Sequence, residues 1–180
     1  MIATRRRRGG YGPISRIAIG LALLATPLGG RAGSVSFQSV PFERAVTLSA
    51  RVVRGTVKAR SAIKIEGDTF HYVELAAAAV LKGPPARPAE TIRVFDEAEW
   101  FRHTHAAAIK AGVVSYADSR YATPIPDAEI KPGVALIVFL RSDAPPAGFP
   151  ANAAFLAAGG AFERAARADE VLRLVGRPAH

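Results

Sequence analysis

The segment VELAAAAVLKG, residues 73–83, decides the fold, because it can form either a helix or a buried strand. Four consecutive alanines favour a helix, since alanine loses no side-chain entropy when it is wound into one. The start of the segment and the residues before it, FHYV at 70–73, are aromatic and β-branched and favour a strand, and KGPP at 82–85 is a turn signal. We therefore predict a strand over residues 70–81. The side chains on its inward face would be Val73, Leu75, Ala77, Ala79 and Leu81.

Four further segments are also expected to be strands. In VTLSARVVRGTVKAR, residues 46–60, the alternating apolar positions change parity near Gly55, which predicts a β-bulge there. ETIRVF, residues 90–95, alternates apolar and polar side chains, and the apolar run ALIVFL, residues 135–140, has the length of a buried strand. FLAAGGAF, residues 155–162, is predicted to be another strand with a bend at its glycines. Short strands in series indicate a β-sandwich or barrel, and alanines suit a narrow barrel interior.

Two helices are expected beside these strands. DEAEWFRHTHAAAIKAG, residues 96–112, can begin at Asp96 as the N-cap and has one apolar stripe. The tail from Glu163 to Val175 favours a helix capped by Asp169, with a final strand over residues 170–175 as the alternative.

The first 32 residues have the pattern of a secretory signal peptide. Arg5–Arg8 give a positive start, residues 17–28 form a short apolar run, and small residues precede a cleavage position after Ala32. A membrane span needs about 20 apolar residues, so we predict cleavage and a secreted or periplasmic protein. A retained anchor is the alternative, and general secretion and twin-arginine export both stay open. Residues 33–180 then form a single domain without a transmembrane span.

Charge and cysteine content limit the possible functions. The chain has a formal net charge of +9, but residues 1–32 hold six of its 24 basic residues and none of its 15 acidic ones. The mature chain has 18 basic residues against 15 acidic ones, a net charge of +3, which argues against nucleic-acid binding. The chain has no cysteine, so disulfides, thiolate nucleophiles, cysteine zinc sites and cysteine lipidation are excluded.

Several short motifs follow one another along the mature chain. In order they are RVVRGTV from Arg51, VLKGP from Val80, ETIRV from Glu90, the Pro132-Gly133 pair, LIVFLR from Leu136 and AGGAF from Ala158. This order resembles a group of exported bacterial proteins whose domain is akin to the netrin-like and TIMP-like fold, an OB-type five-stranded barrel with added helices. The resemblance covers most of residues 45–162 and implies a mainly β barrel with a helix inserted after the third strand. TIMP-type inhibitors bind a protease's zinc through an N-terminal cysteine, and the predicted mature start at Gly33 offers no such residue.

The pair His103 and His105 is the pattern most similar to a metal site. In a strand both imidazoles would project from one face, whereas in the expected helix they lie about 200° apart around the axis. In the strand case Asp96, Glu97 or Glu99 could add an oxygen ligand. Zinc sites need three or four ligands, however, and His71 and His180 have no reason to converge on the pair. A metal-binding protein or metal-dependent enzyme is therefore the alternative hypothesis, and no cofactor is expected.

A basic segment and a single tryptophan are the other candidate sites. Arg54, Lys58 and Arg60 are expected to share an outward strand face, which would suit a surface polyanion such as a lipid headgroup or glycan. No aromatic side chains lie between these charges, which argues against nucleic acid, and a solvated face that discourages edge pairing is the simpler interpretation. Trp100 would either anchor a partner or pack its helix onto the barrel, and packing is the expected role.

The sequence contains no G-x-S-x-G elbow and no phosphate-binding glycine loop. The leading hypothesis is therefore an exported, non-catalytic interaction module of the netrin-like or OB type. Its partner would be an unknown protein or a surface polyanion.

Overall fold

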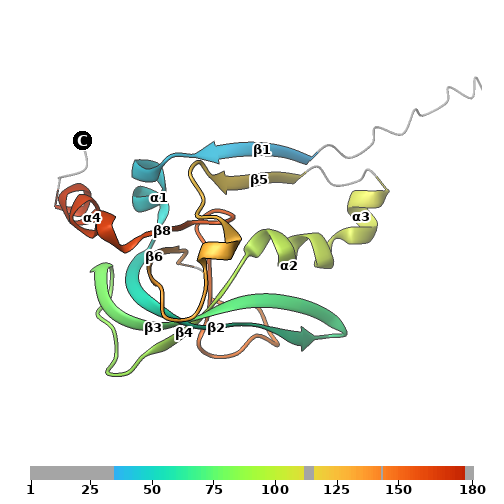
Figure 1. Cartoon of the computed structure of the whole chain (residues 1–180). Helices are drawn as coiled ribbons and strands as arrows, with labels where there is room; N and C mark the ends of the chain where they lie inside the picture. Colours follow the sequence, from blue (N-terminus) through green and yellow to red (C-terminus); the bar gives the residue numbers. More distant parts are fainter. Residues whose placement is uncertain (1–34, 112–115, 143, 177–180) are drawn as a thin grey trace, which may run out of the picture.

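The computed structural model describes residues 35–111, 116–142 and 144–176, and this part of the chain is mainly β (Figure 1). The strands are β1 (Val35–Val40), β2 (Arg51–Ile65), β3 (Asp68–Lys82), β4 (Thr91–Phe95), β5 (Tyr116–Tyr121), β6 (Ala135–Leu140), β7 (Ala153–Phe155) and β8 (Phe162–Arg164). The α-helices are α1 (Phe42–Leu48), α2 (Glu97–Thr104), α3 (Ala106–Lys110) and α4 (Ala168–Val175). Two short 3-10 helices are η1 (Asp127–Glu129) and η2 (Ala165–Arg167).

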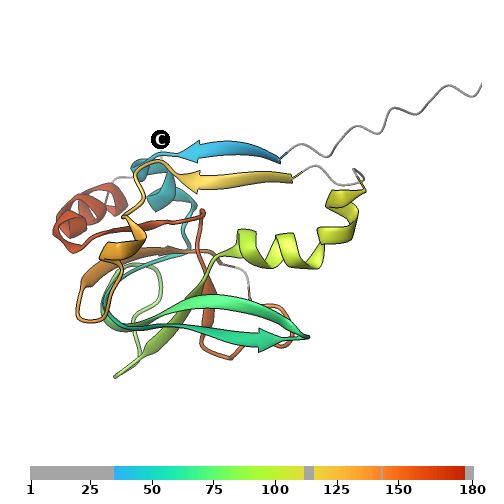
Figure 2. The same ribbon diagram turned by 45° about the vertical axis from the view of Figure 1, so that its right-hand side comes forward.

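Six strands form one curled sheet in the order β7-β4-β3-β2-β6-β8, which makes a half-barrel. The chain just after β7 contacts both sides of this half-barrel, since Leu156 N–H donates to Phe95 O of β4 and Ala157 N–H donates to Phe139 O of β6. Strands β1 and β5 form a separate parallel pair. In both views α2 lies between this pair and the long β2–β3 hairpin, and α4 lies beside α1 (Figures 1 and 2).

The alanine-rich segment is a strand, as predicted. It belongs to β3, which pairs with β2 along its whole length. The register shifts near Gly55, as predicted, where Arg54 pairs with Ala79 and Gly55 pairs with Ala77. The extra residue at this shift is Ala78 of β3, however, and the extra residue of β2 itself is Lys58. A Cβ on Gly55 would lie 2.5 Å from the carbonyl oxygen of Ala76, so the two strands approach too closely there for any other residue.

The strands predicted at residues 90–95 and 135–140 are confirmed as β4 and β6. Most of β6 is buried in the main core, which fills the interior of the half-barrel. A smaller aromatic core, formed by Ile65, Phe70, Phe95 and Phe155, lies at the tip of the β2–β3 hairpin. The strands that enclose these two cores make the described part of the chain mainly β, which is the class that the sequence predicts.

The predicted strand over residues 46–60 is wrong in its first part. The chain forms helix α1 after Pro41, and strand β2 begins only at Arg51. Phe42, Ala45 and Val46 are buried at positions i, i+3 and i+4, which is the spacing of a helix.

Two further boundaries differ from the prediction. The single helix expected over residues 96–112 is divided at His105, whose backbone leaves the helical region at φ −111° and ψ 14°. The continuous strand expected over residues 155–162 is replaced by β7 and β8, because a turn closed by a hydrogen bond from Ala161 N–H to Ala158 O separates them.

The predicted C-terminal helix is confirmed as α4, which is shorter than the predicted segment, but its cap differs. Arg167 occupies the N-cap position, and Asp169 lies in the first turn, where its charge favours the positive end of the helix dipole.

Candidate functional site

The concave side of the half-barrel contains a pocket of about 550 Å³. Its apolar lining comes from several elements: Val73 of β3, Val94 of β4, Ile125 before η1, Leu156 after β7 and Phe162 of β8. These residues meet only because the sheet curls, since they are spread over ninety residues of the chain. An apolar pocket with a few polar groups at its rim is the usual form of a ligand site.

One rim of the pocket is formed by a pair between His71 of β3 and Glu99 of α2. His71 Nδ1 lies 2.8 Å from Glu99 Oε1, and the backbone N–H of His71 donates to Glu99 Oε2 at 3.2 Å. Glu99 is held in place because Asp96 caps α2, accepting a hydrogen bond from Ala98 N–H at 2.9 Å. The Asp96 N-cap predicted from the sequence is therefore confirmed, and the Glu99 carboxylate binds β3.

The opposite rim is formed by Arg60 of β2 and Asp127 of η1. Arg60 donates through Nη1 to Asp127 O at 2.8 Å and through Nη2 to Asp127 Oδ2 at 3.3 Å. Both side chains are exposed, so this pair contributes little stability. Its effect is to hold the segment before β6 against the hairpin beside the pocket.

The charged groups of the two rims contact one another. The His71 ring contacts the Glu99 carboxylate, and no hydroxyl lies within hydrogen-bond distance of that ring in the part of the chain that the structure describes. The pocket offers charge and shape to a ligand, and the carboxylates of Glu99 and Asp127 at its rim are paired with His71 and Arg60. The third carboxylate of the lining, Asp96, accepts the hydrogen bond from Ala98 N–H.

The structure places His103 and His105 in different surroundings. His103 Nδ1 lies 3.5 Å from Asp68 Oδ1, and its ring packs on Phe70. His105 stacks on Phe101, with ring centroids 4.1 Å apart and an angle of 15° between the planes. Among the described residues, no group of three or more His, Asp and Glu side chains is placed to hold a metal ion.

Trp100 is half-buried and packs against the aromatic core at the hairpin tip. It lines a smaller pocket of about 290 Å³ together with Phe70, His103 and Phe149. This is the packing role that the sequence indicates for Trp100, since the indole joins α2 to the sheet.

The three basic residues of the expected polyanion face lie in two different parts of β2. Arg54 lies where β2 pairs with both β3 and β6. Lys58 is the extra residue at a register shift, and Arg60 lies beyond it, where the described residues pair with β2 on the β3 side only. All three are exposed, and Lys64, which is also exposed, adds a further positive charge nearer the hairpin tip, where Glu66 and Asp68 are exposed as well.

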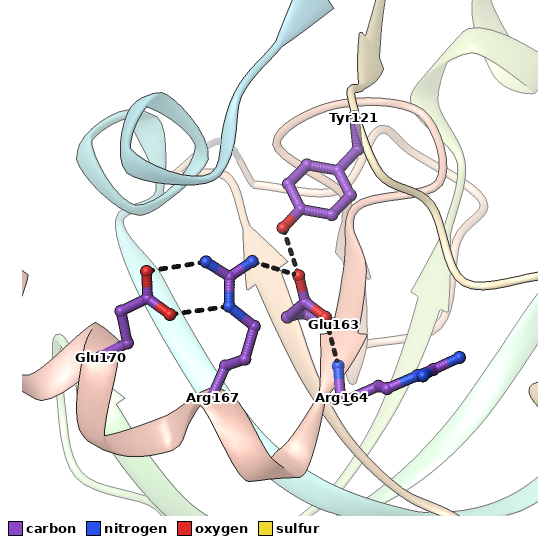
Figure 3. Close-up of polar contacts among 5 residues, drawn as sticks. All are labelled: Tyr121, Glu163, Arg164, Arg167 and Glu170. Carbon is purple, nitrogen blue, oxygen red and sulfur yellow. Dashed lines mark hydrogen bonds and ion pairs between the residues drawn. The ribbon is translucent and has the colours of Figure 1, made fainter.

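A cluster of charged residues around the buried Glu163 was not identified from the sequence (Figure 3). Glu163 of β8 is 6% exposed and accepts hydrogen bonds from Tyr121 Oη at 2.7 Å, Arg167 Nη1 at 2.8 Å and Arg164 N–H at 2.8 Å. Arg167 also binds both oxygens of Glu170. Burial, and then the hydrogen bond to Glu163, raises the pKa of the Tyr121 phenol. The hydrogen bonds to Glu170 and Glu163 outweigh burial and raise the pKa of Arg167.

This cluster holds several elements of the fold together. The Arg167 guanidinium lies 3.5 Å from the centre of the Phe42 ring, so the network joins β5, β8, α4 and α1. The sequence does contain a signal for it, since Glu163 directly follows the buried pair Ala161 and Phe162.

Comparison with known proteins leaves the family open. No protein-family model matches the chain, and no curated protein gives a significant match. Within the described residues, no helix combines the length and hydrophobicity that crossing a membrane requires.

Proposed function

We propose that the protein is an exported, non-catalytic interaction module of the OB or netrin-like type, and that its ligand site is the pocket on the concave side of the half-barrel. The observation that carries this proposal is the pocket of about 550 Å³, with its apolar lining and charged rim. A pocket of this size accommodates side chains of a partner protein or a small ligand.

The surroundings of the pocket support binding over chemistry. The charged rim residues are already paired with each other, as His71 with Glu99 and Arg60 with Asp127. Such pairs fix the position of the rim and give it polarity that selects a ligand. The OB-type character of the proposal is supported by the curled sheet, in which β2 and β3 supply the strands around the pocket.

The export part of the proposal rests on residues 1–32, with their arginines, short apolar run and small residues before Ala32. The test is N-terminal sequencing of the protein recovered from the periplasm or medium. A start at Gly33 is expected. A full-length chain that stays in the cytoplasm would contradict export without affecting the pocket.

The binding part can be tested at Ala62, an exposed residue of β2 that lines the pocket. Peptides are selected from a displayed random library against residues 33–180, and their binding is followed through the NMR amide signals of the protein. The signals of Val73, Val94 and Ile125 are expected to shift. Ala62→Trp, which fills the pocket, is expected to abolish binding, and Ala62→Thr is the matched control. A library that yields no binder, or binding unchanged in Ala62→Trp, would refute the pocket as the ligand site.

A further inference from the structure

Strand β2 has a hydrogen-bonded neighbour on both sides for only half of its length. Its first residues, Arg51–Thr56, pair with β6, and Val57 exchanges hydrogen bonds with Gly133 and Val134. From Lys58 to Ile65, the only strand that pairs with β2 in the described part of the chain is β3. The outer side of this segment is therefore an open sheet edge, which we call the β2 edge (residues 58–64).

The register identifies which backbone groups point outward from the β2 edge. The turn at Glu66 and Gly67 has φ values of 53° and 96°, which is the two-residue turn of a tight hairpin. Ile65 and Asp68 are therefore a hydrogen-bonded pair, and hydrogen-bonded and non-hydrogen-bonded pairs alternate from there. Within the β2 edge, the residues that form non-hydrogen-bonded pairs with β3 are Arg60, Ala62 and Lys64. Their N–H and C=O groups point away from β3, toward the open side.

The other edge of the same hairpin, on β3, has a partner for an outward-pointing backbone group. His71 pairs with Ala62, so its N–H points away from β2, and the Glu99 carboxylate accepts a hydrogen bond from it at 3.2 Å. Helix α2 thus covers the β3 side. The backbone groups of Ala62 and Lys64 have no corresponding acceptor or donor among the described residues. The hairpin is closed on one side and open on the other.

The charges on the β2 edge select its occupant. Lys58, Arg60 and Lys64 are exposed, and Asp127 is bound to Arg60. The exposed carboxylates of Glu66 and Asp68 lie beyond the β2 edge, at the hairpin turn. A second copy of the chain pairing antiparallel about Ala62 would place Arg60 opposite Lys64 of the other copy. Like charges directly opposite each other destabilise a strand pair. An extended segment with acidic residues at alternate positions would place opposite charges there instead.

We propose that the β2 edge accepts an extended acidic segment of a partner protein as an added antiparallel or parallel strand, in the manner of β-augmentation. The inference rests on the proposed function and specifies the partner class. The backbone groups of Arg60, Ala62 and Lys64 supply the main-chain hydrogen bonds, and the basic side chains select for acidic residues. Because Arg60 and Ala62 also line the pocket, a side chain of the added strand reaches it.

The test uses a fluorescent nonapeptide in which glutamate and valine alternate, with anisotropy as the readout and residues 33–180 as the protein. Binding is expected for this peptide. The same peptide with lysine for glutamate, or with N-methyl groups on alternate amides, is expected to bind at least about tenfold more weakly. Equal binding of the N-methylated peptide would overturn the proposal, because strand addition needs those amides.

Substitutions in the β2 edge itself test the same hydrogen bonds through the protein instead of the peptide. Ala62→Pro removes only an outward N–H, which an edge strand tolerates, and is expected to weaken binding about tenfold. Ala62→Thr keeps the N–H and is expected to change binding by less than about twofold. Lys64→Glu is expected to weaken binding of the glutamate peptide and to restore binding of the lysine peptide. Wild-type affinity in Ala62→Pro would overturn the proposal.

The same variants distinguish other occupants and separate the two proposals. Heparin binding that is lost in Lys64→Glu, with no peptide binding, would assign the edge to a polyanion and overturn the proposal. A dimer in sedimentation that Ala62→Pro dissociates would assign the edge to a second copy, with the same consequence. Library peptides blocked by Ala62→Trp but bound normally by Ala62→Pro would refute strand addition while the pocket proposal stands.

Discussion

The buried carboxylate of Glu163 gives the sharpest prediction for stability. One of its oxygens accepts hydrogen bonds from Tyr121 and Arg167, and the other accepts one from Arg164 N–H (Figure 3). In Glu163→Gln the amide oxygen can keep the first two contacts in weakened form, because the charge is gone. The amide NH₂ then faces the N–H of Arg164, so a donor meets a donor in a buried place.

The magnitude follows from these contacts. A hydrogen bond to a charged group contributes about 1.5–3 kcal/mol net, a neutral one contributes about 1 kcal/mol, and a buried group left unpaired costs about 1–3 kcal/mol. Weakening two bonds and losing the third therefore lowers the free energy of unfolding by about 3 kcal/mol. A domain of this size has about 5–15 kcal/mol in total, so Glu163→Gln is expected to remain folded at 25 °C.

The assay is urea unfolding at pH 7, followed by far-UV circular dichroism. Glu129→Gln is the matched control, because Glu129 pairs with Arg164 at the surface and its loss is expected to cost less than about 0.5 kcal/mol. Tyr121→Phe, alone and combined with Glu163→Gln, completes a double-mutant cycle with an expected coupling of about 1 kcal/mol. A change below about 0.5 kcal/mol in Glu163→Gln, or strict additivity with Tyr121→Phe, would refute the reasoning.

Three further predictions concern other parts of the molecule. Gly55→Ala is expected to lose about 2–3 kcal/mol in urea unfolding, because its Cβ would lie 2.5 Å from a backbone oxygen, whereas the control Gly159→Ala meets nothing closer than 3.5 Å. The hydrogen bond from Arg51 lowers the pKa of the Glu90 carboxylate, so this pair is expected to contribute about 1 kcal/mol of stability above pH 4.5 and to lose it as the pH falls below that value. In Glu90→Gln the free energy of unfolding is therefore expected to depend less on pH in the acid range. An unchanged pH profile of the free energy of unfolding would contradict this prediction. Elemental analysis of the purified protein is expected to find no stoichiometric metal, and an ion lost in the His105→Ala variant would establish the metal hypothesis instead.

Alternation and turn signals were sufficient to predict the central strands. Aromatic and β-branched residues before the alanines, and the proline turn after them, outweighed the helical propensity of alanine itself. Helix α1 was missed because Val46 and Leu48 fit a strand period as well as a helical one, and Leu48 is in fact exposed. The pairing of β1 with β5 could not be predicted, since it joins segments about eighty residues apart and YADSRY has no alternating apolar pattern.

The sequence predicted less of the candidate site than of the fold. The basic residues Lys58 and Arg60 were identified, but their position at an open edge depends on where β6 begins. The contact between His71 and Glu99 joins residues 28 positions apart and depends on how α2 leaves β4. Spacing along the chain carries no information about such contacts, because they arise from the curl of the sheet.

The parallel β1–β5 pair has a consequence for the order of assembly. On a ribosome the amino-terminal strand emerges first, yet its pairing partner appears only when Tyr116–Tyr121 has been synthesised. Until then β1 has no partner strand to join, while the β2–β3 hairpin can already close locally. Strand β1 is thus paired late in synthesis, and a nascent chain halted before residue 116 would leave β1 accessible to proteases.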